Sequence, residues 1–266
     1  MERSNEDLRA LARQQLSGKW GMSLLVSLVA GLLGASDSQG SGLLSRLSDV
    51  LDLASDLLPD GILHSLPIST LSGGSTLFMV PLLILSLALW ALGCTVLLGR
   101  HRYFIGLIAG EKPPFDILFS RFPIFLKALG LNLYMGLLVL AWSLPAIVLL
   151  VLAVVLPRAS GLMVLLSLAA LVLPIQASLR YSQAAYLMAQ YPEKGILESV
   201  ADSKALMQGQ KWRYFVLGLS FIGWILLCVL TLFIGFLWLD PYMHATFSAF
   251  YLERTGQLDL EPQPEA

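Results

Sequence analysis

The stretch ALGLNLYMGLLVLAWSLPAIVLLVLAVVL, residues 128–156, runs for 29 positions without a charged side chain. Uncharged apolar runs of about 18 residues or more are typical of membrane-spanning helices. As one helix the stretch would be about 43 Å long, whereas the hydrocarbon core of a bilayer is about 30 Å thick. We therefore expect a membrane helix that tilts or bends, with Pro145 as the kink.

Similar runs recur along the chain and predict the fold class. The other apolar segments are Trp20–Gly34, Leu77–Leu98, Gly161–Leu179 and Tyr214–Tyr251. The last has 38 residues, too many for one crossing, so we expect it to turn near residues 235–241 and come back. The first is short, and the helix before it can lengthen it. The pattern predicts an all-α, polytopic transmembrane bundle of about six membrane helices, five full spans and a short returning C-terminal helix, with interfacial amphipathic helices.

The composition agrees with a membrane protein. Of 266 residues, 56% are apolar and 13% are charged, against roughly 25% charged residues in soluble domains. The net charge of −1 gives no reason to expect nucleic acid as a partner. Cys94 and Cys228 both lie in apolar runs, which favours buried thiols over a disulfide or a metal site.

We expect one transmembrane domain over residues 1–254. Residues 1–19 carry Leu8, Leu11, Ala12 and Leu16 on one helical face, a pattern that suits a short cytoplasmic helix in the membrane interface rather than a cleaved signal. Residues 99–127 and 180–213 are predicted to be cytoplasmic loops. The polar tail, residues 255–266, has acidic residues between prolines and is predicted to be disordered.

The segment 35–75 is predicted to be an extracytoplasmic insert. Its apolar residues recur at helical spacing from Leu43 to Leu58, with Asp49, Asp52 and Asp56 facing away. We expect an amphipathic helix that lies on the outer leaflet. A lid over a central cavity and a docking surface are the alternatives.

The basic residues predict the orientation. If the helices alternate, 15 of the 17 Lys and Arg residues fall on one side, and only Arg46 and Arg158 fall on the other. Positive residues concentrate on the cytoplasmic side of membrane proteins. We therefore expect a cytoplasmic N-terminus and, if the last segment returns, a cytoplasmic C-terminus.

No catalytic motif is present, so the expectation is a protein that is not an enzyme and has no cofactor. His64, His101 and His244 lie in different segments without ligand-like spacing, and His101 is expected to contact headgroups. Polar residues inside spans are few. Asn132 and Gln176 are interpreted as helix-to-helix hydrogen-bonding residues, and Asp240, before Pro241, as the cap of the final helix.

The polar stretch SKALMQGQKWRYF, residues 203–215, is interpreted as a joint between a cytoplasmic helix and the next span. Ser203 lies on the apolar face of that helix, where its hydroxyl can bond back into the helix, and Gly209 is placed to end it in a left-handed conformation. Basic and aromatic residues then mark the membrane interface. The candidate contacts for lipid or a protein partner are Arg100, Arg102, Lys204, Lys211, Trp212 and Arg213.

The segments RYSQAAYLMAQYP and SKALMQGQKWRYFVLGLSFIGWILLCVLTLFIGFLWLDPYMHATFSAFY, together with LRALARQQLSGKWG and GRHRYFIGLIAGEKPPF, resemble a bacterial membrane-protein family known as domain of unknown function 975. Phe233 replaces the first glycine of the family's Gly-Ile-Gly pattern, which leaves Gly235 as the expected bend. The residues that carry the structural motif are Ser203, Gly209, Gly223, Trp224, Gly235, Asp240, Pro241, Tyr242 and Tyr251. The resemblance implies a multi-pass protein of the bacterial plasma membrane and implies no activity.

The first functional hypothesis is a non-enzymatic membrane component that binds membrane lipids or a protein partner. A transporter or channel subunit for a small or amphipathic substrate is the alternative, and an intramembrane enzyme is the third. An enclosed polar cavity would favour transport, surface grooves on a solid core would favour lipid or partner binding, and clustered titratable groups around a cavity would favour an enzyme.

Overall fold

A computed structural model describes residues 3–35, 75–156 and 160–258, and the regular elements in these ranges are all helical. In chain order they are α1 (Asn5–Leu16), α2 (Trp20–Leu32), α5 (Ser75–Ile108), the 3-10 helices η2 (Phe115–Phe119) and η3 (Phe122–Ile124), α6 (Phe125–Val155), α7 (Ser160–Ala170), α8 (Val172–Tyr181), α9 (Ala184–Gln190), α10 (Ile196–Leu206), α11 (Lys211–Leu219), α12 (Ile222–Leu230) and α13 (Phe236–Arg254).

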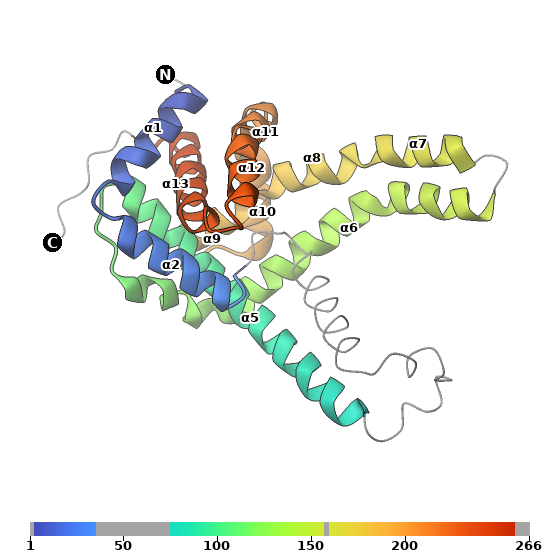
Figure 1. The fold of residues 1–266 in the computed structure, drawn as a ribbon, viewed down its shortest axis with the longest axis horizontal. Helices are drawn as coiled ribbons and strands as arrows, with labels where there is room; N and C mark the ends of the chain where they lie inside the picture. The colour runs from blue at the N-terminus through green and yellow to red at the C-terminus, as the bar shows by residue number, and fades with distance from the viewer. Residues whose placement is uncertain (1–2, 36–74, 157–159, 259–266) are drawn as a thin grey trace.

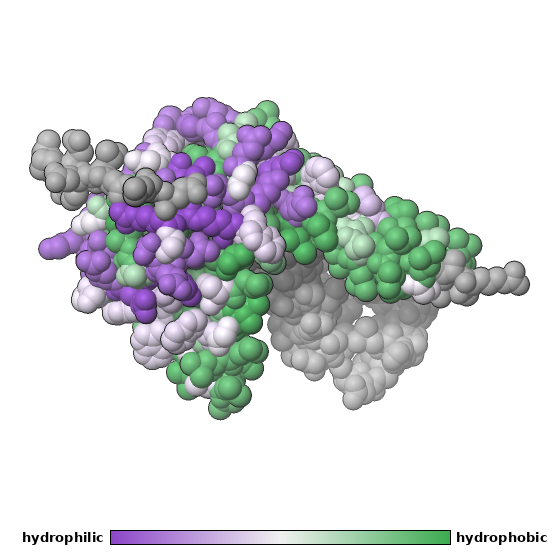
Figure 2. Space-filling model, turned by 90° about the horizontal axis from the view of Figure 1, so that it is seen from above, coloured by the Kyte–Doolittle hydropathy of each residue, from purple (hydrophilic) through white to green (hydrophobic). Residues whose placement is uncertain are grey.

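The molecule has two regions of different character (Figure 1). The first, which we call the body, contains α1, α2, the C-terminal half of α5 and α9 to α13, and it holds the largest hydrophobic core. The second, which we call the arm, is the antiparallel pair of α6 and α7, and it projects away from the body, with α8 leading back from it. In space-filling view the polar surface gathers over the body and the arm is apolar (Figure 2).

Helix α1 begins at a capping box, in which Ser4 and Asp7 bond each other's backbone N–H groups. The bonds from Ser4 hold the pKa of the Asp7 carboxyl below its usual range. Its apolar face is as expected, but Leu8, Ala12 and Leu16 are fully buried, and α1 packs on α13 and α5. The predicted membrane-interface placement of this face is therefore wrong, because protein covers it.

The same region corrects the first predicted span. Residues Ser17–Lys19 form a turn, so α2 begins as a separate helix at Trp20 and is not an extension of α1. Helix α2 is apolar but has only 13 residues. A helix of that length reaches about 20 Å, short of a bilayer core of about 30 Å.

Helix α5 is longer than the predicted span, which ended at Leu98. It continues to Ile108, so residues 99–108 are not part of a cytoplasmic loop. The extension is stable because Tyr103, Phe104 and Leu107 fill the core of the body. Gly99 permits this packing, since a Cβ at that position would overlap the backbone carbonyl of Leu118.

The C-terminal segment turns earlier than predicted. The turn spans Thr231–Gly235, with Leu232 and Phe233 at φ values of 52° and 68°. Asp240 and Pro241 lie inside α13, so the predicted role of Asp240 as the cap of that helix is wrong. The last helix is not short either. It has 19 residues and is largely buried in the body, because its small residues Ala245 and Ala249 allow close packing.

Four helical segments in the described part of the chain are long and apolar enough to cross a membrane: Leu83–Ile108, Phe115–Ala153, Gly161–Gln190 and Lys211–Leu230. By length and composition these mark the chain as a membrane protein. The predicted count of about six membrane helices is not confirmed. Helix α6, which contains most of the uncharged stretch 128–156, is continuous over 31 residues with Pro145 inside it.

Two predicted segments fall partly or wholly outside the described residues. The insert at 35–75 lies outside them except for its two ends. Of the tail, Thr255–Leu258 is described, and Gln257 is hydrogen-bonded to Gln190 and Tyr191 at 2.5 and 2.7 Å. The prediction of a disordered tail from residue 255 is therefore wrong for these four residues, because side-chain amides fasten them to the body.

Candidate functional site

The six predicted contact residues do not form one surface. Arg100 is buried in α5, and Arg102 is ion-paired with Glu111 at 3.5 Å. Lys204 is exposed on α10. Only Lys211 and Trp212 share a surface feature, a groove described below. The prediction grouped these six residues by their positions in the sequence. In the fold, side chains that are neighbours in the sequence point in different directions.

Arg213 has a structural contact network. Its Nη2 bonds Glu253 Oε2 of α13 at 2.6 Å and the backbone carbonyl of Arg3. Glu253 Oε1 also accepts from the Arg3 backbone N–H at 2.6 Å. The side chains of Arg213 and Glu253 are only 18% and 9% exposed. We call this network the Arg213 clasp, and it joins the start of the chain to α11 and α13.

The motif residues have mainly structural surroundings. Gly209 has φ +76°, which confirms the left-handed end of α10. The hydroxyl of Ser203 does not bond back into its own helix. It accepts from Gln183 N and donates to Arg180 O, both at 3.1 Å, across to the break between α8 and α9. Tyr251 donates to Gln190 Oε1 at 2.6 Å.

The remaining motif residues line surface features or pack closely. Gly235 packs against Cys228, and a Cβ there would lie 2.7 Å from the Cys228 sulfur. Gly223 in α12 has no such neighbour. Trp224, Gly235 and Tyr242 line an apolar groove of about 330 Å³ that also contains Arg13, Trp20 and Trp238.

A second groove runs between α8 and α11 and is the surface that holds two of the predicted contacts. Its volume is about 430 Å³. We call it the α8–α11 groove, and its lining residues are Val172, Ile175, Gln176, Leu179, Lys211, Trp212 and Phe215. Trp212 is 73% exposed and packs on Phe215 with ring centroids 5.6 Å apart. The groove is thus apolar along its length and has a cation and an indole at the start of α11.

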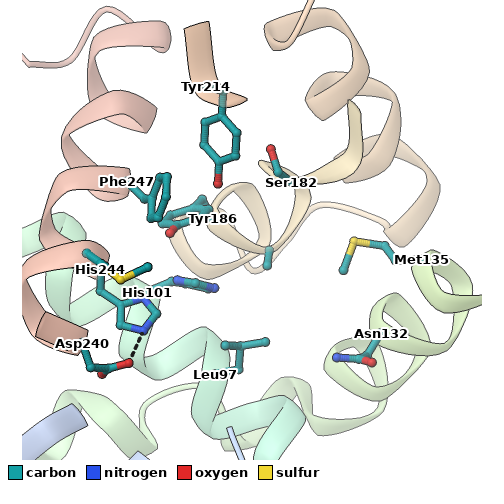
Figure 3. Close-up of a pocket in the computed structure, with 12 residues that line it drawn as sticks. Leu97, His101, Asn132, Met135, Ser182, Tyr186, Tyr214, Asp240, His244 and Phe247 are labelled. Atoms are coloured by element: carbon teal, nitrogen blue, oxygen red, sulfur yellow. Dashed lines mark ion pairs between the residues drawn. The ribbon is translucent and has the colours of Figure 1, made fainter. Parts of the chain in front are cut away.

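A third feature, which we call the polar cavity, lies where the body meets the N-terminal part of α6. It has a volume of about 220 Å³ and is enclosed by side chains from α5, α6, α9, α11 and α13, with Ser182 from the α8–α9 break (Figure 3). Its polar lining residues are His101, Asn132, Ser182, Tyr186, Tyr214, Asp240 and His244.

Asp240 and His244 are paired at the base of the polar cavity. His244 Nε2 lies 3.3 Å from Asp240 Oδ1, one helical turn away on α13 (Figure 3). The His244 side chain is buried, whereas that of Asp240 is 42% exposed. Asp240 also lines a neighbouring groove that contains Arg100 and Ser27, so its carboxylate lies between two hollows.

Aromatic rings form the upper wall of the polar cavity. Tyr214 lies 5.1 Å from Phe247 between ring centroids, and its hydroxyl points into the hollow (Figure 3). Tyr186 packs on His101 at 4.0 Å. The expected headgroup contact of His101 is wrong, because the ring is buried between Tyr186 and the ring of His244, whose centroid is 6.3 Å away.

Asn132 closes the opposite side. It is 7% exposed, and its amide group extends from α6 toward the hollow (Figure 3). No donor among the described residues reaches Asn132 Oδ1. The predicted helix-to-helix hydrogen bond is therefore not made by this oxygen. Gln176, which received the same prediction, is exposed in the α8–α11 groove.

Sequence reasoning missed the polar cavity because its residues come from segments more than a hundred positions apart. One local signal was available. Asp240 and His244 stand four residues apart in an apolar helix, the spacing that places two side chains on one face. Among the described residues no group of three or more His, Cys, Asp or Glu side chains gathers as a metal site would need.

A model of the family described as "Protein of unknown function (DUF975)" matches residues 1–257, nearly the whole chain. No curated protein and no solved structure matches the chain.

Proposed function

We propose that this chain, which belongs to the DUF975 family of proteins of unknown function, is a non-enzymatic membrane component. In this proposal it binds anionic phospholipid in the α8–α11 groove. The observation that carries the proposal is the combination, in one groove, of apolar walls with Lys211 and Trp212 at the start of α11. The groove lies between two segments of membrane-spanning length, Gly161–Gln190 and Lys211–Leu230, which supports the proposal that its walls face lipid.

The groove suits the two parts of a phospholipid. Ile175, Leu179 and Phe215 offer apolar surface to an acyl chain. The Lys211 ammonium is a point charge suited to a phosphate, and the exposed Trp212 has the amphipathic ring that settles at headgroup level. A phospholipid with net negative charge gains from both features, whereas a zwitterionic lipid gains mainly from the apolar walls.

The proposed setting is the bacterial plasma membrane, with both ends of the chain in the cytoplasm. Fifteen basic residues fall on the predicted cytoplasmic side and two fall on the other side, which supports this orientation. Replacing Ser160 or Glu265 with cysteine and labelling intact cells tests it. We expect the cysteine at 160 to react from outside. Reaction of the cysteine at 265 with an impermeant reagent would overturn the cytoplasmic C-terminus.

Lipid binding can be measured on the purified protein in detergent, by native mass spectrometry with added phosphatidylglycerol or phosphatidylethanolamine. We expect Lys211→Gln to reduce retention of phosphatidylglycerol about threefold to tenfold, since one buried or half-buried contact of a charge to phosphate is worth about 1 kcal/mol. Lys204→Gln is the matched control, because Lys204 is exposed outside the groove. Equal retention by the wild type, Lys211→Gln and Trp212→Ala proteins would falsify the proposed site.

One observation favours transport of a small polar substrate as a second candidate. The polar cavity and the groove beside α2 share Asp240, so a polar molecule in the cavity would lie one side chain away from a second hollow. Uptake of a radiolabelled substrate into proteoliposomes that contain the protein tests this function once a ligand of the cavity is known. Binding without uptake would exclude it.

A further inference from the structure

The polar cavity has one carboxylate to offer a ligand, and it belongs to Asp240. Arg100 lines the neighbouring groove, and its positive charge acts on Asp240 from the α2 side. An enclosed site whose own charge is a carboxylate selects for a cation.

The carboxylate of Asp240 has capacity left for a ligand. Its bonds to His244, at 3.3 Å, and to Ser27 use two of the roughly four acceptor positions that a carboxylate has over two oxygens. The side chain is 42% exposed, although the helix around it is largely buried. The His244 ring therefore orients the carboxylate and leaves part of it open to the hollows.

The aromatic rings around the polar cavity favour the same kind of ligand. The faces and edges of Tyr186, Tyr214 and Phe247 surround the hollow (Figure 3). A cation over such a ring is attracted by its negative face, and the attraction increases when water is excluded. Aromatic walls together with a carboxylate are the arrangement that recognises organic ammonium groups.

Asn132 adds a polar contact opposite Asp240. Its amide is more than nine-tenths buried, extends into the hollow, and has an oxygen that no described donor reaches (Figure 3). A ligand group that hydrogen-bonds the Asn132 amide would add a polar contact opposite Asp240.

We propose that the polar cavity binds a small organic ammonium ion, with Asp240 as its counter-charge, Tyr186, Tyr214 and Phe247 as its aromatic walls, and Asn132 as a hydrogen-bonding partner. The volume of about 220 Å³ is below the roughly 300–1,000 Å³ of pockets for drug-sized ligands, so the ligand is small. This site is separate from the α8–α11 groove and does not depend on lipid binding.

The probe is 2-phenylethylamine, whose ammonium and phenyl groups match the two halves of the site. Its uncharged analogue, 2-phenylethanol, and its anionic analogue, phenylacetate, separate charge from shape. Each is titrated into the purified protein in detergent, and binding is followed by the rise in thermal unfolding temperature and by calorimetry. We expect the amine to bind about tenfold more tightly than the alcohol, and phenylacetate not to bind, because a buried charge pair is worth at least about 1.5 kcal/mol.

Asp240→Asn keeps the shape of the side chain and removes its charge. We expect it to weaken amine binding about tenfold and to leave binding of the alcohol unchanged. Asp116→Asn, on the exposed surface of η2, is the matched control and should bind the amine as the wild type does. If Asp240→Asn does not fold, Asn132→Leu tests the site instead, with an expected loss of about fivefold for loss of one hydrogen bond.

Three results would overturn the proposal. One is amine binding no tighter than alcohol binding in the wild type, which would indicate partition into the micelle. Another is equal amine affinity in Asp240→Asn, Asn132→Leu and Asp116→Asn. The third is tighter binding of phenylacetate, which would indicate that the histidines and hydroxyls act as donors to an anion. Loss of phosphatidylglycerol retention in Lys211→Gln with intact amine binding would show that the two sites are independent.

Discussion

The body and the arm both contain helices that are long and apolar enough to cross a membrane, and these helices bury very different amounts of surface. An apolar window of 18 residues within Leu83–Ile108, which enters the body, is 50% buried, whereas such windows within Phe115–Ala153 and Gly161–Gln190, which include the arm, are each 11% buried. Helix α5 shows the contrast within one element. Leu83–Leu85 are exposed, and Tyr103–Leu107 are almost wholly buried.

The difference separates two ways of stabilising a membrane helix. The body buries polar side chains such as His101, Ser203 and His244 among protein atoms. The arm exposes Leu, Val and Ile side chains, which only lipid can cover favourably. We therefore expect substitutions in the body to change the stability of the fold, and similar substitutions in the arm to have little effect.

The largest effect is expected from a large core side chain. Phe250→Ala removes a fully buried ring from the body and should lower the free energy of unfolding by about 3–5 kcal/mol. Leu137→Ala, at an exposed position of α6 in the arm, should change it by less than about 1 kcal/mol. Unfolding in mixed micelles of dodecyl maltoside and increasing SDS measures both. Equal losses would contradict the distinction between body and arm.

A smaller effect is expected from the Arg213 clasp. Glu253→Gln leaves the Arg213 guanidinium nearly buried without its counter-charge and should cost about 2–4 kcal/mol. Glu198→Gln is the matched control, because its ion pair with Lys194, at 4.0 Å, is exposed and worth less than about 1 kcal/mol. The double variant Arg213→Gln with Glu253→Gln should lose less than the sum of the two single variants.

A stabilising change is expected at the turn before α13. Phe233 has φ 68°, a conformation that glycine adopts without strain, and it stands at the glycine of the family pattern. Phe233→Gly should therefore raise the free energy of unfolding by about 1 kcal/mol. Phe233→Ala removes the same exposed ring but keeps the Cβ, so it should give no gain. If both variants behave alike, the backbone conformation is not the cause.

The smallest effect concerns the surface of the body. The hydrogen bond from Lys194 to Asp202, at 2.5 Å, raises the pKa of Lys194 above its usual value. The stabilisation is therefore complete below the pKa of an unfolded lysine, about 10.4, and is lost as the pH rises through the raised value. We expect a loss below about 1 kcal/mol between pH 10 and pH 12. Asp202→Asn should reduce this part of the pH dependence, measured by unfolding at each pH.

Local patterns predicted the features that depend on local sequence. The stretch 128–156 became α6 with bounds within three residues of those expected, because an uncharged run of that length has no other stable form in a membrane. The left-handed backbone conformation of Gly209 was predicted because the residues of one helical turn determine where a helix ends.

Features that depend on distant contacts could not be predicted in this way. Arg100 and His101 indicated the end of a span, yet both are buried because α13 and α9 cover this part of α5. Asp240 before Pro241 resembled a helix start, but α13 begins earlier because the turn at Thr231–Gly235 is closed by its own hydrogen bonds. The polar cavity forms where five helices converge. The hydropathy of each segment does not show which helical faces come into contact.

The Arg213 clasp has a consequence for the order in which the protein matures. The Arg3 N–H bonds a carboxylate 250 positions later in the chain, and α1 packs its apolar face on α13. A ribosome makes α1 long before it makes α13, so Leu8, Ala12 and Leu16 lack the part of their cover that α13 provides until that helix is made. Closure of the body therefore waits for α13, and a translation arrest before residue 253 would leave the body without the Arg213 clasp.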